Sequence, residues 1–175
     1  MTEVQKLAKF TSSRKFADLS EETIGQLKIR LLDSLGVAIG ALEGEPIKMI
    51  KEQLDDFGGK PKASLIGGGR TSPDRAALFN SALVRYLDFN DSYLAKNETC
   101  HPSDNIGSLL AAGQYNDIDG EHFLTAMAIA YQVQSRLSDV APVRDKGFDH
   151  TVQGSYGAAA GASYALGLDP VKTAN

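Results

Sequence analysis

The sequence predicts an all-α fold, and three observations support this prediction. Apolar residues recur at helical spacing through most of the chain, and helix-capping residues and glycines separate these segments. Only residues 62–70 (KASLIGGGR) resemble a strand followed by a turn. The chain has 175 residues, of which 42% are hydrophobic and 23% charged, so its composition is that of a globular protein and not of a disordered one.

The first predicted helix covers residues 18–42, and Asp18 or Ser20 is expected to cap its N-terminus. A second helix is expected after Pro46 and should stop at Gly58. The first helix carries an apolar stripe made of Ile24, Leu27, Leu31, Leu35 and Ile39.

The middle of the chain predicts three further helices, at residues 74–89, 106–115 and 121–139. The first of these follows Ser72-Pro73, which is a cap followed by a first-turn proline. Ser103 or Asp104 is expected to cap the second, after an unusual polar segment from 90 to 105. Tight contact with another helix is indicated by the small residues of the 74–89 helix, which are Ala76, Ala77, Ser81 and Ala82.

The last long helix covers residues 150–166 and is rich in glycine and alanine, which predicts that it is buried against other backbones. Gly167 closes it. Asp169-Pro170 is the beginning of another helix, for which only six residues remain. Residues 1–175 are therefore expected to form an incomplete helical domain that stops where a longer protein continues.

Charge and composition argue against several classes of protein. The net charge of −4 speaks against nucleic-acid binding. No apolar run approaches the roughly 20 residues of a membrane helix, and residues 1–10 lack the apolar core of a signal peptide. The single cysteine, Cys100, cannot form an internal disulfide or hold an iron–sulfur cluster alone. We expect a soluble, cytoplasmic protein.

Two segments contain the residues that are suited to acid–base chemistry. Asp88, Asp91 and Ser92 lie where the 74–89 helix ends, and His101 follows in a loop. His150 begins the Gly/Ala helix, where the helix dipole disfavours a charged imidazole. Both groups also have ordinary explanations: solvated turn aspartates with a surface histidine, and a capping or core histidine.

Cations in the same loops would suit an acidic substrate. Lys96, Arg144 and Lys146 are the candidates, although each is equally compatible with an ordinary solvated loop charge. The histidines lack metal-ligand spacing, so no metal is expected. Gly67, Gly68 and Gly69 form a turn without the lysine and hydroxyl of a phosphate loop.

Three segments together resemble the MmgE/PrpD family: GGGRTSPDRAALFNSALVRYLDFNDSY, HPSDN and GFDHTVQGSYGAAAGASYALGL. The resemblance implies a large helical domain, a smaller α/β lid that this chain does not contain, and a homodimer. It also implies catalysis without a cofactor, metal or iron–sulfur cluster. Asp88, Ser92, His101 and His150 match the family's active-site aspartate, hydroxyl residue and two histidines, and Asp91 is the second acidic residue of the same motif. We expect Asp88, His101 and His150 to be catalytic, and Asp91 and Ser92 to bind substrate. Lys146 is a further substrate-binding candidate, because of its place in the loop and not because of the resemblance.

The family's members include 2-methylcitrate dehydratase, cis-aconitate decarboxylase and iminodisuccinate epimerase. LDFND followed by HPSDN is most similar to the methylcitrate dehydratases, which implies dehydration of 2-methylcitrate to 2-methylaconitate in propionate catabolism. Decarboxylation or epimerisation of a related di- or tricarboxylate stays open. So does a non-catalytic role, as a helical fragment or dimerisation module.

Overall fold

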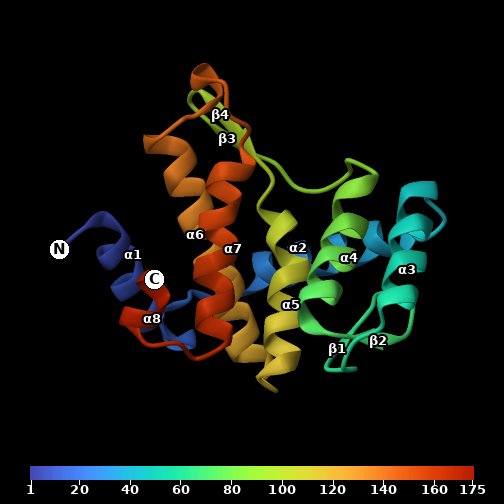
Figure 1. The fold of residues 1–175 in the computed structure, drawn as a ribbon. Helices are drawn as coiled ribbons and strands as arrows, with labels where there is room; N and C mark the ends of the chain where they lie inside the picture. The colour runs from blue at the N-terminus through green and yellow to red at the C-terminus, as the bar shows by residue number, and fades with distance from the viewer.

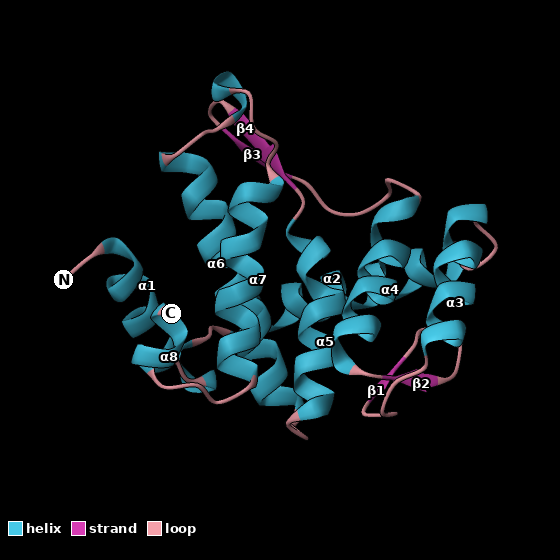
Figure 2. Ribbon diagram, in the orientation of Figure 1, coloured by secondary structure: helices cyan, strands magenta, loops and turns pink.

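A computed structural model describes residues 1–175, which form eight α-helices and two small antiparallel hairpins (Figures 1 and 2). The helices are α1 (Glu3–Ser13), α2 (Glu21–Gly40), α3 (Glu45–Phe57), α4 (Pro73–Tyr86), α5 (Ile106–Tyr115), α6 (Gly120–Val140), α7 (Thr151–Ala165) and α8 (Pro170–Ala174). The hairpin strands are β1 (Ala63–Ser64) with β2 (Arg70–Thr71), and β3 (Tyr93–Ala95) with β4 (Glu98–Cys100). The predicted all-α fold is confirmed.

The helices form a row with α2 behind it (Figure 1). In this row α3 contacts α4, α4 contacts α5, α5 contacts α7, and α7 lies along α6. Helix α2 crosses behind and contacts both α4 and α6. At one end α1 packs on α8, which brings the two ends of the chain together. None of the helices combines the length and apolarity that crossing a membrane demands.

Glycines allow the closest helix contacts. A Cβ atom on Gly161 of α7 would lie 2.9 Å from Ala130 Cβ and 3.0 Å from the Ala126 carbonyl oxygen, both in α6. A Cβ on Gly107 of α5 would clash with the backbone of Ser81 in α4. The expectations that the Gly/Ala helix is buried against other backbones and that α4 makes a tight helix contact are therefore confirmed.

Two main clusters of buried apolar side chains hold the row together. The first lies between α2, α3, β1, α4 and α5, and the second lies between α2, α5, α6 and α7. Residues with no exposed surface in the first include Leu83 and Val84, and in the second Ile106, Leu109 and Met127.

The β1–β2 hairpin confirms the predicted strand and turn. Ala63 pairs with Thr71, and Gly67, Gly68 and Gly69 between the strands all have positive φ, as the turn prediction requires. The buried Asn80 of α4 connects the hairpin to the helix. Its side chain accepts a hydrogen bond from the Ile66 N–H (2.9 Å) and donates one to the Ser64 carbonyl (3.0 Å).

The structure corrects several details of the sequence prediction. Helix α1 was not predicted, although Thr2 and Gln5 form a capping box there. Ser20 caps α2 as expected, but Ile39 is 61% exposed and not part of the buried stripe. The reason is geometric: at about 100° per residue, Ile39 lies about 120° around the helix from the buried Leu27.

The polar segment 90–105 contains the β3–β4 hairpin, which the sequence prediction did not include. It ends in a 3₁₀ turn, Pro102–Asn105, that leads directly into α5. The position before α5 is Asn105, and its side chain makes no capping bond. The expected caps Ser103 and Asp104 therefore have other roles.

Candidate active site

The segment between α4 and α5 places His101 beside Asp91 and Ser92. Helix α4 ends at Tyr86, and the chain then folds back on itself in the β3–β4 hairpin, where Tyr93 pairs with Cys100. The residues flanking this pair, Ser92 and His101, are therefore brought opposite one another. The proline after His101 favours the extended backbone that His101 adopts (φ −121°, ψ 87°).

The contacts of His101 fix which ring nitrogen carries the proton. Its Nδ1 lies 2.8 Å from the Asp91 carbonyl oxygen and 3.3 Å from Ser92 Oγ. Because a carbonyl oxygen only accepts hydrogen bonds, Nδ1 is the donor in the neutral ring. Nε2 is then unprotonated and can accept a proton from a substrate.

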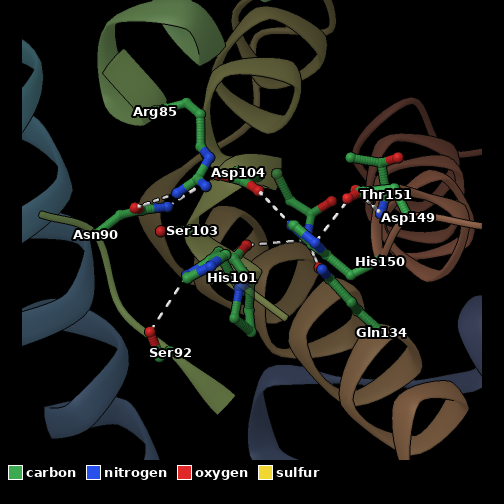
Figure 3. Close-up of polar contacts among 12 residues, drawn as sticks. Arg85, Asn90, Ser92, His101, Ser103, Asp104, Gln134, Asp149, His150 and Thr151 are labelled. Carbon is green, nitrogen blue, oxygen red and sulfur yellow. Dashed lines mark hydrogen bonds and ion pairs between the residues drawn. The ribbon is translucent and has the colours of Figure 1, made fainter. Parts of the chain in front are cut away.

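His150 comes from a segment 49 residues away and meets His101 edge to face. The ring centroids are 5.2 Å apart and the ring planes make an angle of 72° (Figure 3). His150 directly precedes α7 and is 8% exposed. Its Nδ1 lies 3.2 Å from Asp149 Oδ1 and its Nε2 lies 4.0 Å from Asp104 Oδ2, and neither nitrogen makes a hydrogen bond.

A polar chain links the end of α4 to this histidine pair (Figure 3). The Arg85 guanidinium donates to Asn90 Oδ1 (3.0 Å), and Asn90 Nδ2 donates to Asp104 Oδ1 (2.9 Å). Burial raises the pKa of Asp104, although the positive charges of Arg85, His101 and His150 work against this rise.

The predicted site residues fall into two groups. Asp91, Ser92, His101 and His150 are brought together: the Asp91 carboxylate accepts from the Ser103 N–H (3.0 Å), and its carbonyl holds His101.

Asp88 and Lys146 form the second group. The helix predicted at residues 74–89 ends earlier, at Tyr86, so Asp88 does not lie on it and shares no helix face with Ser92. Asp88 has a φ of +56°, its side chain is 73% exposed, and its carboxylate pairs with Arg85 (2.6 Å) and not with an imidazole. Lys146 is exposed in the 3₁₀ turn Arg144–Lys146.

Three residues of the site were not predicted as site residues: Asn90, Asp104 and Gln134. Asp104 was predicted only as a possible helix cap. Gln134 is buried in α6, where its Oε1 accepts from Asn105 Nδ2 (2.6 Å). Asp104 lies in HPSDN, directly after the candidate His101, so its closeness to the site could have been inferred. An aspartate just before a helix also suits a helix cap, and the sequence analysis gave it that role.

Several buried polar atoms around the histidine pair have no hydrogen-bond partner. They are Ser103 Oγ, Gln134 Nε2 and both ring nitrogens of His150. Buried polar groups in proteins nearly always bond to protein, water or ligand, so this cluster is suited to binding a polar ligand. No three His, Cys, Asp or Glu side chains converge in the geometry of metal ligands.

Glu98 joins the hairpin that bears His101 to the connector that leads to His150. Its side chain has no exposed surface, and its Oε2 accepts from the N–H groups of Val143 (2.9 Å) and Arg144 (3.2 Å). Arg144 Nε also lies 3.3 Å from Glu98 Oε1, so this arginine is paired within the protein. Burial acts to raise the pKa of Glu98, but the two N–H donors and the Arg144 charge outweigh it and lower the pKa below the ordinary 4.5.

Glu98→Gln should destabilise the protein at neutral pH and have less effect in acid. The lowered pKa means that the Glu98 carboxylate adds stability above the ordinary value of 4.5, and that this contribution is lost as the pH falls through the lowered pKa. We expect a loss of about 1.5–3 kcal/mol in the free energy of unfolding at pH 7, as for hydrogen bonds to a charged group, measured by urea unfolding.

At pH 3 the difference between the wild type and Glu98→Gln should have shrunk. Glu52→Gln is the matched control, because Glu52 is exposed on α3, and it should change stability little at either pH. A loss of the same size at both pH values would show that the negative charge of Glu98 does not hold the connector.

The chain is similar over nearly its whole length to a known protein family. A family model described as "MmgE/PrpD N-terminal domain" matches residues 5–175. The 2-methylcitrate dehydratase of Escherichia coli (strain K12) is 30% identical over 150 residues, which are 79% of this chain and 31% of the relative.

Two eukaryotic relatives give similar matches. The mitochondrial 2-methylcitrate dehydratase of Yarrowia lipolytica is 29% identical over 161 residues, covering 85% of this chain and 31% of the relative. The "Alkylcitrate dehydratase phiI" of a fungus (Fungal sp., strain ATCC 74256) is 31% identical over 173 residues, covering 86% of this chain and 33% of the relative. The chain thus spans about a third of the length of the curated relatives it matches.

Proposed function

This chain belongs to the MmgE/PrpD family, and on that premise we propose that it supplies the acid–base histidines of a lyase that removes water from a small di- or tricarboxylate. The proposed substrate is 2-methylcitrate and the proposed product 2-methylaconitate, because the relatives above are named as citrate-type dehydratases. The observation that carries the proposal is the meeting of His101 and His150, 5.2 Å apart between ring centroids.

Dehydration next to a carboxylate needs a base for the carbon-bound proton and an acid for the leaving hydroxide. We assign His101 Nε2 as the base, since Nδ1 is held by the Asp91 carbonyl. Protonated His150 is then the acid, and the carboxylates of Asp104 and Asp149 on either side of its ring offset the helix dipole that disfavours the charge. The C–H proton moves to His101, its electron pair forms the C=C bond, the C–O bond breaks, and the departing hydroxide takes a proton from His150 to leave as water.

The remaining predicted residues have supporting roles in this proposal. The Ser92 hydroxyl is exposed beside His101, where it is placed to donate to a substrate carboxylate. Asp91 uses both its carbonyl and its carboxylate within the protein, which supports a role in holding His101 more than in touching substrate. For Asp88 and Lys146, both exposed, the roles in catalysis and carboxylate binding stay predictions.

Self-association also stays a prediction. The exposed apolar side chains of Leu87 and Phe89 lie where α2 passes the end of α4, beside Val37. Exposed apolar surface of this kind favours association with another protein surface. Sedimentation analysis should therefore show a dimer or a larger species, and a stable monomer would contradict the prediction.

The experiment is a substrate screen on the full-length protein with 2-methylcitrate, citrate and cis-aconitate, measured by loss of substrate and appearance of an unsaturated acid. Residues 1–175 alone are expected to be inactive. We expect 2-methylcitrate to be consumed fastest, with formation of the unsaturated product. Loss of carbon dioxide from cis-aconitate would identify a decarboxylase instead. Binding of these acids without turnover would favour the non-catalytic helical module.

A further inference from the structure

Asp104 is the only carboxylate that faces Nε2 of His150 within 4.0 Å (Figure 3). Asp149 faces the other ring nitrogen, Nδ1, at 3.2 Å. His150 therefore lies between two carboxylates, one on each side of its ring. The 4.0 Å distance to Asp104 is too long for a hydrogen bond, so Nε2 is left unbonded while a negative charge lies nearby.

The position of the Asp104 side chain is fixed from several sides. Its backbone N–H donates to the His101 carbonyl (3.0 Å), and its own carbonyl accepts from Ser81 Oγ (3.3 Å). Its Oδ1 accepts from Asn90, which Arg85 holds in turn. Only Oδ2 remains free, and this is the oxygen that faces His150.

The charges around Asp104 come from three elements. Arg85 faces it from α4, His101 and Asp91 from the segment between α4 and α5, and His150 from the start of α7. A negative charge within 4–6 Å of an imidazole favours its protonated form. Asp104 is thus placed to keep a proton on His150 without contacting the group to which that proton is given.

We propose that Asp104 is a positioning residue for His150: its fixed carboxylate favours the imidazolium and leaves Nε2 without a hydrogen bond inside the protein, so that this nitrogen can donate a proton. The proposal rests on the proposed function, in which His150 is the acid. It adds a residue that acts through His150 and does not touch substrate.

Asp104→Asn is the test, because asparagine keeps the size of the side chain and the oxygen that accepts from Asn90. We expect kcat to fall about tenfold or more, because a general acid contributes about a hundredfold or more to the rate and loses part of this effect without the carboxylate that favours its charged form. KM should change less than about threefold, because the interaction is with His150 and not with the bound substrate. The unfolding temperature should stay the same.

The pH profile separates this role from a merely structural one. The acidic limb of the kcat profile follows protonation of the base, His101, and Asp104→Asn should leave it unchanged. The alkaline limb follows loss of the proton from the acid, His150, and in Asp104→Asn it should begin at a lower pH, because the carboxylate that favours the imidazolium is gone. Asp145→Asn is the matched control, because Asp145 is exposed in the connector, and it should leave kcat and the pH profile unchanged.

An unchanged kcat in Asp104→Asn, or a raised KM with unchanged kcat, would overturn the proposal. A second readout needs no substrate: the NMR resonance of His150 Nε2 should move in Asp104→Asn and not in Asp145→Asn. A resonance that does not move overturns the proposal whatever the activity. A moving resonance in a protein that turns over none of the carboxylates supports the contact between Asp104 and His150 and refutes the proposed function.

Discussion

His101→Gln in the full-length protein is expected to lower turnover of 2-methylcitrate by at least about a hundredfold, the size usual for losing a general acid or base. Glutamine is similar in size to histidine and is polar and uncharged, so the segment that bears His101 should keep its fold. It cannot accept or release a proton near neutral pH, so only the chemical step is lost. The measurement is kcat and kcat/KM, with circular dichroism to show that the fold is unchanged.

His122→Gln is the matched control for this loss. His122 lies on α6, where its Nε2 contacts the Tyr164 carbonyl oxygen at 3.2 Å, away from the histidine pair. Its replacement should leave turnover within a few-fold of wild type. If His101→Gln also stays within a few-fold, His101 is not the base.

Gly107→Ala should cost about 2–3 kcal/mol in the free energy of unfolding, because the added methyl group has no space. A Cβ at Gly107 would overlap the backbone nitrogen and Cα of Ser81, which cannot move as a flexible side chain would. Helices α4 and α5 would have to separate, and both contribute to the buried clusters that hold the row of helices together. Urea unfolding measures the loss.

The control for this packing effect is Gly25→Ala on α2. No atom lies within 4 Å of a Cβ at Gly25, so the change adds only helix propensity and should stabilise the protein by about 0.5–1 kcal/mol. Gly107→Ala with a neutral or stabilising effect would mean that α4 and α5 are not as closely packed as described.

Local sequence signals were sufficient to predict most of the fold. Ser20 and Asp169 cap helices as expected, and Pro73 begins α4. The missed helix α1 and the misplaced Ile39 have different causes. Helix α1 has little apolar surface of its own beyond the side that packs on its neighbours. Ile39 was assigned to the stripe although it lies about 120° around the helix from Leu27, and at this turn the adjacent Ala38 faces the core instead.

The candidate site was predictable only in part. His101 and His150 lie in different segments, and the family resemblance, not spacing, indicated that they belong together. Asp104 was misassigned because an aspartate before a helix suits a cap, and a local pattern cannot show that Asn90 will hold its side chain instead. The prediction for Asp88 depended on where α4 ends, and the ends of helices are the least certain part of a sequence prediction.

A double-mutant cycle on the two imidazoles tests the central claim most directly. His101→Gln, His150→Gln and the double variant are compared by kcat/KM for 2-methylcitrate. Two groups that act as one unit lose most of their effect with the first removal, so the double variant should lie within a few-fold of the weaker single variant. If the two single losses in kcat/KM multiply in the double variant, the histidines act independently, which would contradict the proposed mechanism. Unchanged kcat/KM in either single variant would contradict it as well.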